Sequence, residues 1–470
     1  MAALFAYATW FRVRGIQADF PLLGDQVRDW AIALGPAGSL PLVGTPSTAG
    51  GHTLGPIYYW LIWASRVTIG PFFDNLPHAG GMGLSVVQSV ADLVLFHALW
   101  RRLGSGLLAL ATSLLIATSP FDAAVSASVW NPQVAVAFSK IAIALVLLAD
   151  QRAGRLWPIL TAAAAWFALQ AHSSAVWITA AVLLWLIVDR LRADGLRGAA
   201  WTAYDLVAIV LILQLPFFLH HLRHPEPGAG PTGAIGAAAR AASGEAPLDV
   251  AGSARALAHS IEIMLVEPAH PGWTWVVLLV AGAIVVAGAA GALASPEGPA
   301  LRGGRQGPAL GGGREGPAPG LDVALVTVLP LALAVLGYSV LQRHNDYWYL
   351  PLAPSAALMV AFAVATALPA RRARLLAGAL ALAAIVVAQP ARFHHSRLLN
   401  RLPEYGTLVA ASRQMVRDGV SPRDIHAAFV RQPTDPTFLF TVLGGRLDPN
   451  SPIEADILPT GRVVYRGTAP

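Results

Sequence analysis

The chain has 470 residues, of which 55% are hydrophobic and only 12% are charged, whereas soluble domains carry about 25% charged residues. This composition excludes a soluble fold and predicts an all-α polytopic bundle whose partner is the lipid bilayer. The net charge of +6 does not indicate a nucleic-acid partner, because the arginines fall in short clusters between apolar blocks, as in membrane proteins.

The N-terminal part combines a short apolar block with a long polar loop. Residues 1–11 are too short to span a membrane comfortably and carry no cleavage site, so they predict a truncated first helix rather than a signal peptide. In the loop that follows, residues 12–81, the stretch 55–70 (GPIYYWLIWASRVTIG) gathers the tyrosines and tryptophans typical of a membrane interface. We predict that this stretch is a helix lying on the outer surface and not a crossing.

Further apolar blocks have the length that a helix needs to cross roughly 30 Å of hydrocarbon. They lie at residues 82–100, 105–120, 134–149, 156–171, 174–188, 202–219, 273–294, 321–340, 347–368 and 372–389. Together with the first helix, they predict about eleven transmembrane helices.

Every second connection between these blocks is rich in arginine. The arginines concerned are Arg101, Arg102, Arg152, Arg155, Arg190, Arg192, Arg197, Arg302, Arg305, Arg314, Arg371, Arg372 and Arg374. Because positive connections stay on the cytoplasmic side, we expect the N-terminus inside and the C-terminus outside. Residues 12–81 and 220–271 are then outer loops, the second with an amphipathic stretch at 249–266, and residues 295–320 are a low-complexity cytoplasmic linker.

The composition divides the chain after Gln389. Residues 1–389 are predicted to form the transmembrane domain, and residues 390–470 turn polar over a length that suffices for a small extracytoplasmic α/β domain. Within that domain we expect a helix over 403–418, a strand over 424–430 and an edge strand over 462–466.

Several polar side chains fall on the outer face in this topology and suggest a shared site. They are Asp25, Asp29, His52, Tyr58, Asn131, His172, Arg343 and His344. Two more charges, Asp92 and Lys140, lie inside predicted spans, where an unpaired charge costs at least about 2.5 kcal/mol. We favour a structural ion pair between these two, and the alternative is that Lys140 faces a polar cavity and binds a lipid phosphate.

A series of short motifs runs in a characteristic order along the chain. The motifs are GDQVRDW, HTLGPIYYWL, ALWRRLG, ATSP, VWNP, QAHSSA and YWYLPLAPSAAL. In their order and topology they resemble the bacterial GT-C glycosyltransferases of family 39, which are related to protein O-mannosyltransferases and the lipid A aminoarabinose transferase. The Ala, Gly and Arg richness is typical of a bacterial protein of high GC content, so we expect a multi-pass protein of the bacterial inner membrane.

The resemblance implies a hexosyl- or pentosyltransferase that inverts the anomeric carbon of a polyprenyl-phosphate sugar. The family's catalytic base matches Asp25, and direct displacement needs such a carboxylate within reach of the acceptor hydroxyl. The leaving phosphate needs positive charge or hydrogen-bond donors, for which Arg343, His344 and His52 are candidates. The sequence departs from the family at Leu54, where many members carry a basic residue before two prolines, so His52 is at best a shifted substitute.

Each candidate has a simpler structural interpretation. Asp25 could be the N-cap of its helix, and Asp29 is either a second acid or, as we slightly favour, a solvated loop charge. His52 could be an exposed loop residue. Asn131 precedes a proline and so indicates a helix start, and His172 is more often a hydrogen-bonded interface histidine than a ligand.

Two other functional classes remain open from the sequence. A transporter or lipid flippase also uses intramembrane charges, although we find no internal repeat typical of transporters. A noncatalytic assembly protein is the second alternative. The sequence identifies neither the sugar nor the extracytoplasmic acceptor, and it assigns no cofactor, so participation of a divalent cation stays open.

Overall fold

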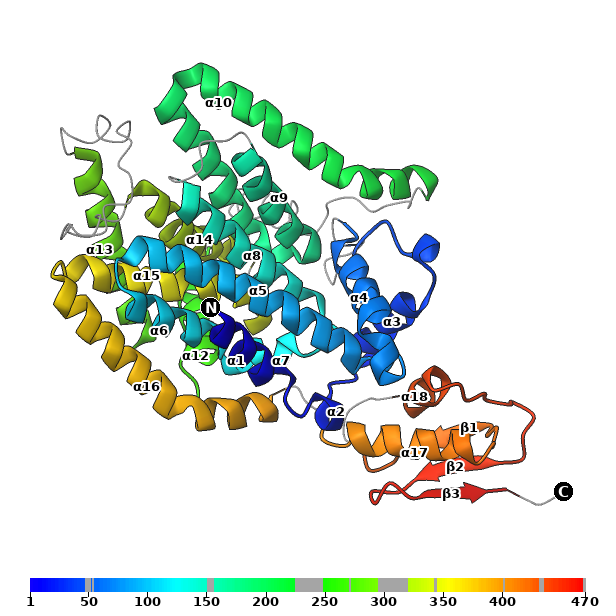
Figure 1. Cartoon of the computed structure of the whole chain (residues 1–470). Coiled ribbons are helices and arrows are strands. Elements are labelled where there is room, and N and C mark those ends of the chain that lie inside the picture. The colour runs from blue at the N-terminus through cyan, green and yellow to red at the C-terminus, as the bar shows by residue number, and fades with distance from the viewer. Residues whose placement is uncertain are drawn as a thin grey trace.

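The computed structural model is a bundle of helices with a small sheet at the C-terminal end (Figure 1). It describes residues 1–46, 52, 55–149, 156–224, 248–269, 272–294, 320–341, 345–399, 402–430 and 435–467. This architecture confirms the predicted all-α membrane bundle with a small α/β domain. The linker predicted at 295–320 lies outside the described residues except for its last position.

The predicted spans coincide with helices. These are α1 (Ala2–Val13), α5 (His78–Leu103), α6 (Gly106–Ala117), α8 (Asn131–Leu148), α9 (Leu156–Ala171), α10 (Val176–Arg223), α13 (Thr274–Ala294), α14 (Leu321–Leu341), α15 (Ala353–Ala367) and α16 (Arg371–Leu398). The short helix α7 (Pro120–Ser126) follows α6 and was not predicted. Among the described residues, seven helices are long and apolar enough to cross a membrane, or eight if the bent pair α6 and α7 is one span. The helix α10 contains two predicted spans, because Gly195 (φ 68°, ψ −163°) breaks it into two arms.

Helices α3 (Gly24–Leu34) and α4 (Ile57–Thr68) pack on each other beside the N-terminal end of α5. The twelve residues of α4 span about 18 Å, too short to cross the hydrocarbon, as predicted for a surface helix. Between α1 and α3 lies the single turn α2 (Ile16–Asp19), and α12 (Val250–Leu265) forms the predicted amphipathic helix.

The two ends of the bundle differ in what they carry (Figure 1). Helices α3, α4 and α17 lie at one end, which we call the α3 end. The bend of α10, the last turn of α5 and the first turn of α16 lie at the opposite end. Because the arginines at positions 101–102, 190–197 and 371–374 lie in these opposite segments, we call it the basic end.

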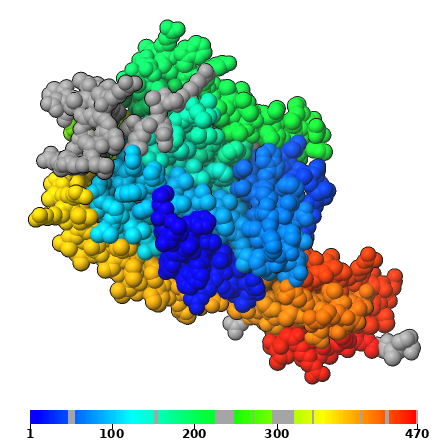
Figure 2. Space-filling model, viewed as in Figure 1, coloured from blue at the N-terminus to red at the C-terminus, as the bar shows by residue number. Residues whose placement is uncertain are grey.

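The C-terminal domain packs on the α3 end and forms a projection beside the N-terminal segment (Figure 2). Its elements are α17 (Tyr405–Arg417), β1 (Asp424–His426), α18 (Pro436–Val442), β2 (Glu454–Ile457) and β3 (Val463–Arg466). The sheet has the order β1-β2-β3, with β1 parallel and β3 antiparallel to β2. The predicted helix and both predicted strands are present, while β2 and α18 were not predicted. A hydrogen bond of 3.0 Å between the Tyr405 hydroxyl and His78 Nδ1 ties the domain to α5.

Close helix packing makes a first prediction about stability. A Cβ atom added at Gly81 of α5 would lie 2.0 Å from the carbonyl oxygen of Ala127, a backbone atom that cannot move aside. We therefore expect Gly81→Ala to lower the free energy of unfolding by about 1–3 kcal/mol, measured by thermal unfolding in detergent. Gly291→Ala in α13 is the control, because among the described residues no atom beyond the nearby backbone of its own helix lies within 4 Å of the added Cβ. An unchanged melting temperature for Gly81→Ala would contradict this packing.

Candidate active site

Two carboxylates on α3 are joined by one arginine. Arg28 Nη1 lies 2.8 Å from Asp25 Oδ1, and Arg28 Nη2 lies 2.8 Å from Asp29 Oδ1. The Asp25 side chain is 57% exposed, whereas that of Asp29 is 1% exposed. The N-cap of α3 is Leu23, so the N-cap interpretation of Asp25 is wrong. The solvated-loop interpretation of Asp29 is also wrong, because α4 covers it.

Asp29 is buried by two tyrosines of α4. The Tyr58 hydroxyl donates to Asp29 Oδ2 at 3.0 Å, and the Tyr59 hydroxyl donates to Oδ1 at 3.2 Å. Burial raises the pKa of Asp29 to about 6, although Arg28 and the two hydroxyls favour the ionised form. Burial, followed by the neighbouring Asp29 charge, also raises the pKa of Tyr58. Near neutral pH, Asp29 is therefore an ionised group that holds Arg28 next to Asp25.

A second group of predicted residues gathers where α8 begins and α9 ends. Asn131 is the first residue of α8, as its Asn-Pro sequence predicts, and its Nδ2 donates to the carbonyl of Ala171 at 2.7 Å. His172 Nδ1 accepts from the backbone N–H of Ser174 at 3.2 Å, and its ring lies 5.8 Å from that of Tyr347. Burial lowers the pKa of His172 to about 4, so this ring is neutral at pH 7.

Close packing at Gly55 brings the start of α4 against the end of α9. The carboxylates of α3 and the residues near His172 therefore lie at the same end of the bundle. Gly55 precedes α4, and a Cβ added there would come within 2.4 Å of the Gln170 side chain on α9. Gln170 in turn donates to the carbonyl of Leu213 at 2.7 Å and so joins α9 to the second arm of α10. The start of α4 therefore packs on the end of α9, next to His172.

Lys140 lies in a buried charge cluster with Arg12, Asp92 and Asp122. Lys140 Nζ is 2.7 Å from Asp92 Oδ1 and 3.4 Å from Asp122 Oδ2, which confirms the predicted Asp92–Lys140 pair. Arg12 Nη2 is 2.7 Å from Asp92 Oδ2 and 3.0 Å from Asp122 Oδ2. All four side chains are at most 5% exposed. Lys140 also donates to Gln88 Oε1 at 3.0 Å, so its three protons have protein acceptors, which favours the structural interpretation.

Arg12 and Asp122 were not singled out in the sequence. The sequence contained a signal for Arg12, because an arginine at the predicted outer end of the first helix is an exception to the positive-inside rule. The signal for Asp122 was weaker. It follows the N-cap Ser119 by three residues, and an acidic residue in the first turn of a helix is common without any further role.

The remaining predicted residues are His52, Arg343 and His344. His52 Nδ1 lies 3.1 Å from the carbonyl of Gly44, and its ring is 6.2 Å from that of His220 at the end of α10. Arg343 and His344 lie outside the described residues. Within the described ranges, no group of three or more His, Asp or Glu side chains is arranged to hold a metal ion.

Two cavities are prominent in the described structure. One of about 360 Å³ lies at the α3 end, between Asp74 and the α17 residues Arg413 and Arg417. The other, of about 610 Å³, lies at the basic end against α10. Asp25 lines neither of them, so its position at the mouth of a substrate cavity stays a prediction.

Comparison of whole structures identifies the fold. The chain has a TM-score of 0.52 and 13% identity to the crystal structure of ArnT from Cupriavidus metallidurans bound to undecaprenyl phosphate, and the match covers 95% of this chain and 85% of that one. For ArnT in the apo state the TM-score is 0.51 and the identity 14%, over 95% and 84% of the two chains. An oligosaccharyltransferase from Archaeoglobus fulgidus gives a TM-score of 0.47 at 12% identity, over 95% and 64%.

Sequence comparison alone does not reach this result. No protein-family model matches the chain, and no curated protein matches it in sequence. At 13–14% identity, the structural similarity shows the fold of the chain and does not by itself show its activity. The chain has the fold of ArnT, which confirms at the level of the fold its resemblance to the GT-C glycosyltransferases.

Proposed function

We propose that the protein is a membrane glycosyltransferase that moves a sugar from a polyprenyl-phosphate donor to an extracytoplasmic acceptor. The observation that carries the proposal is the ion-paired carboxylate Asp25, which lies on α3, between α1 and the long helix α5, in a fold shared with ArnT. The crystal structure of ArnT with undecaprenyl phosphate supports a lipid-phosphate carrier as the donor's leaving group.

Asp25 is assigned as the general base of a single displacement. Its carboxylate takes the proton of the acceptor hydroxyl while that oxygen bonds to the anomeric carbon. The bond between the anomeric carbon and the phosphate oxygen breaks, and the polyprenyl phosphate leaves with the electron pair. Attack from the face opposite the leaving group inverts the anomeric carbon.

Positive charge must meet the leaving phosphate in this scheme. Arg28 supplies one guanidinium next to Asp25, and His52, Arg343 and His344 stay candidates from the sequence. Asp29, Tyr58 and Tyr59 do not need to touch substrate in this account. They act as positioning residues, because Asp29 is buried and binds Nη2 of Arg28, whereas Asp25 binds Nη1.

A binding measurement tests the proposed donor. Purified protein should bind radiolabelled undecaprenyl phosphate saturably, and unlabelled undecaprenyl phosphate should displace it much better than undecaprenol, which lacks the phosphate. Equal displacement by the alcohol would mean that the protein recognises only the hydrocarbon chain, and the proposal would then lose its donor.

The pH dependence of transfer tests the role of Asp29. Because the pKa of Asp29 is about 6, the ionised fraction that holds Arg28 is near full at pH 8 and about a tenth at pH 5. We expect the rate to fall in the same proportion through pH 6. Asp29→Asn should be slow at every pH and should lack this step, and a wild-type step preserved in Asp29→Asn would assign it to another group.

The orientation in the membrane is proposed from the two ends of the bundle. The α3 end carries Asp25 and the C-terminal domain, and the arginine-rich connections lie at the basic end, which supports an extracytoplasmic α3 end. A reporter that is active only in the cytoplasm should therefore stay silent when fused to the C-terminus. It should be active when inserted between α5 and α6, and the reverse pattern would overturn the orientation.

A further inference from the structure

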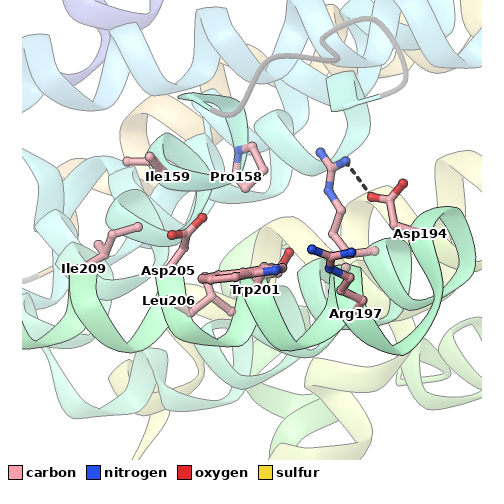
Figure 3. A pocket seen from close by; sticks show the side chains of 11 residues that line it. Pro158, Ile159, Asp194, Arg197, Trp201, Asp205, Leu206 and Ile209 are labelled. Carbon is pink, nitrogen blue, oxygen red and sulfur yellow. Dashed lines mark ion pairs between the residues drawn. The ribbon is translucent and has the colours of Figure 1, made fainter.

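In the proposed transfer, the sugar must lie at the same end of the bundle as Asp25. The larger cavity does not meet this condition, because it lies at the basic end, between the first turns of α9 and the second arm of α10 (Figure 3). In Figure 1, the bend of α10 beside this cavity and helix α3 lie at opposite ends of the bundle. The sugar must instead be held at the α3 end.

Three aromatic side chains from separate elements meet at the α3 end. Trp130 precedes α8, His172 follows α9, and Tyr347 lies in the 3-10 helix η6 (Asp346–Leu352). The ring centroids of Trp130 and Tyr347 are 5.2 Å apart, and those of His172 and Tyr347 are 5.8 Å apart. All three residues are half-buried, so each keeps part of its surface open. We call them the aromatic cluster.

Each ring of the aromatic cluster carries one polar hydrogen. His172 is neutral at pH 7 and uses Nδ1 to accept from the backbone N–H of Ser174, so its single proton is on Nε2. The other two donors are the indole N–H of Trp130 and the hydroxyl of Tyr347. Among the residues that the structure describes, none of these three groups has a hydrogen-bond partner, and none is enclosed. The cluster therefore offers three neutral donors to a ligand.

Asn131 adds an acceptor beside these donors. Its Nδ2 donates to the carbonyl of Ala171, the residue before His172, and this bond holds the amide in place at 2.7 Å. Its Oδ1 has no hydrogen-bond donor within the described ranges and is not enclosed there. Donors and an acceptor, all uncharged, are thus gathered around aromatic rings.

Helix α4 connects the aromatic cluster to the carboxylates of α3. Gly55, just before α4, packs against the side chain of Gln170, two residues before His172. One turn after Gly55, the Tyr58 hydroxyl donates to Asp29. The same short helix therefore holds the cluster and the carboxylates in a fixed arrangement, as transfer requires.

Neutral hydrogen-bonding groups around aromatic rings match a sugar. Sugar hydroxyls donate and accept hydrogen bonds, and sugar C–H groups, with their small positive charge, pack on the negative faces of aromatic rings. A phosphate, in contrast, is bound most strongly by cations.

We propose that Trp130, His172 and Tyr347 hold the sugar ring of the polyprenyl-phosphate donor, a subsite that rests on the proposed function. The donor carries a sugar in every version of that function, whereas the acceptor is a lipid, a glycan or a protein. The competing role for these rings is an aromatic belt at the membrane interface, which would contribute to stability and not to recognition of a sugar.

Equilibrium binding to the purified full-length protein tests the subsite. The probes are undecaprenyl phosphate and the same lipid carrying glucose, mannose or galactose. We expect at least one glycosylated lipid to bind about tenfold more tightly than undecaprenyl phosphate, because ring stacking and hydrogen bonds add to its affinity. Equal binding of all four lipids would overturn the subsite alone. Failure of undecaprenyl phosphate itself to bind would overturn the proposed donor, and the subsite with it.

Two variants separate sugar recognition from stability. Trp130→Leu should reduce the advantage of the glycosylated lipid by about three- to tenfold and leave the affinity for undecaprenyl phosphate unchanged. Tyr347→Phe keeps the ring and should lose only the share of one hydrogen bond, about threefold.

Trp166→Leu is the matched control for Trp130→Leu. Trp166 is also half-buried, but its Nε1 donates to Gln214 at 3.1 Å, so its indole N–H already has a protein partner. The advantage of the glycosylated lipid should be unchanged in this control. An advantage that survives in both Trp130→Leu and Tyr347→Phe, or that is lost equally in Trp166→Leu, would assign the rings to the membrane interface and overturn the proposal.

Discussion

Asp25→Asn should lower the rate of sugar transfer by about 100- to 10,000-fold, the usual contribution of a general base. Asparagine has nearly the same shape but cannot take the proton of the acceptor hydroxyl. Folding should be preserved, because the Asp25 side chain is 57% exposed and its ion pair is on the surface, where such pairs contribute at most about 1 kcal/mol. The rate is measured as transfer of labelled sugar from the lipid donor to a membrane extract.

Asp74→Asn is a closely matched control for this experiment. Asp74 has the same side-chain exposure, 57%, and forms a surface ion pair of 2.7 Å with Arg413. It lies at the same end of the bundle, but it has no part in the proposed displacement. Transfer that survives in Asp25→Asn as well as in Asp74→Asn would contradict the assignment of Asp25 as the general base.

Lys140→Met should destabilise the protein by about 3–5 kcal/mol, the cost of leaving a buried charge without its partner. Methionine fills a similar volume, but Asp92 and Asp122 are then left with Arg12 as the only cation of the buried charge cluster. We expect a clearly lower melting temperature and a lower yield of folded protein in detergent. The cluster joins α1, α5, α7 and α8, so its loss affects the centre of the bundle.

The double variant Asp92→Asn with Lys140→Met separates charge balance from the loss of one side chain. It leaves one cation, Arg12, and one carboxylate, Asp122, which pair at 3.0 Å. Stability should therefore recover in part relative to Lys140→Met. The alternative role for Lys140, binding of the carrier phosphate, would be favoured if Lys140→Met kept its melting temperature but lost transfer.

The sequence predicts the helices well, because an apolar segment in lipid must satisfy its own backbone hydrogen bonds and a helix does so. It predicts their ends less well. The change to polar composition after Gln389 indicated a boundary there, yet α16 runs through Pro390 to Leu398. A change in amino-acid composition indicates where a helix leaves the apolar environment. It does not indicate where the helical hydrogen bonding ends. The strand β2 was missed for another reason, since Glu454–Ile457 is only four residues long and its parallel partner β1 lies about thirty residues earlier in the chain.

In the candidate site, too, the features that depend on local sequence were predictable, and those that depend on distant residues were not. Spacing along α3 is enough to place Asp25 and Asp29 one helical turn apart. The burial of Asp29 was not predictable from spacing, because it depends on hydroxyls from Tyr58 and Tyr59, about thirty residues away in the chain. Only the packing of α4 on α3 turns Asp29 from a predicted loop charge into a buried carboxylate.

The fate of the bond between sugar and phosphate tests the central claim most directly. Wild-type protein in liposomes is given a polyprenyl-phosphate sugar that is labelled both in the sugar and in the phosphate, together with a membrane extract as acceptor. The account predicts that the labels separate, with the sugar label in the acceptor fraction and the phosphate label in free polyprenyl phosphate. Labels that stay together while the intact lipid moves between leaflets would show a transporter and would contradict the account.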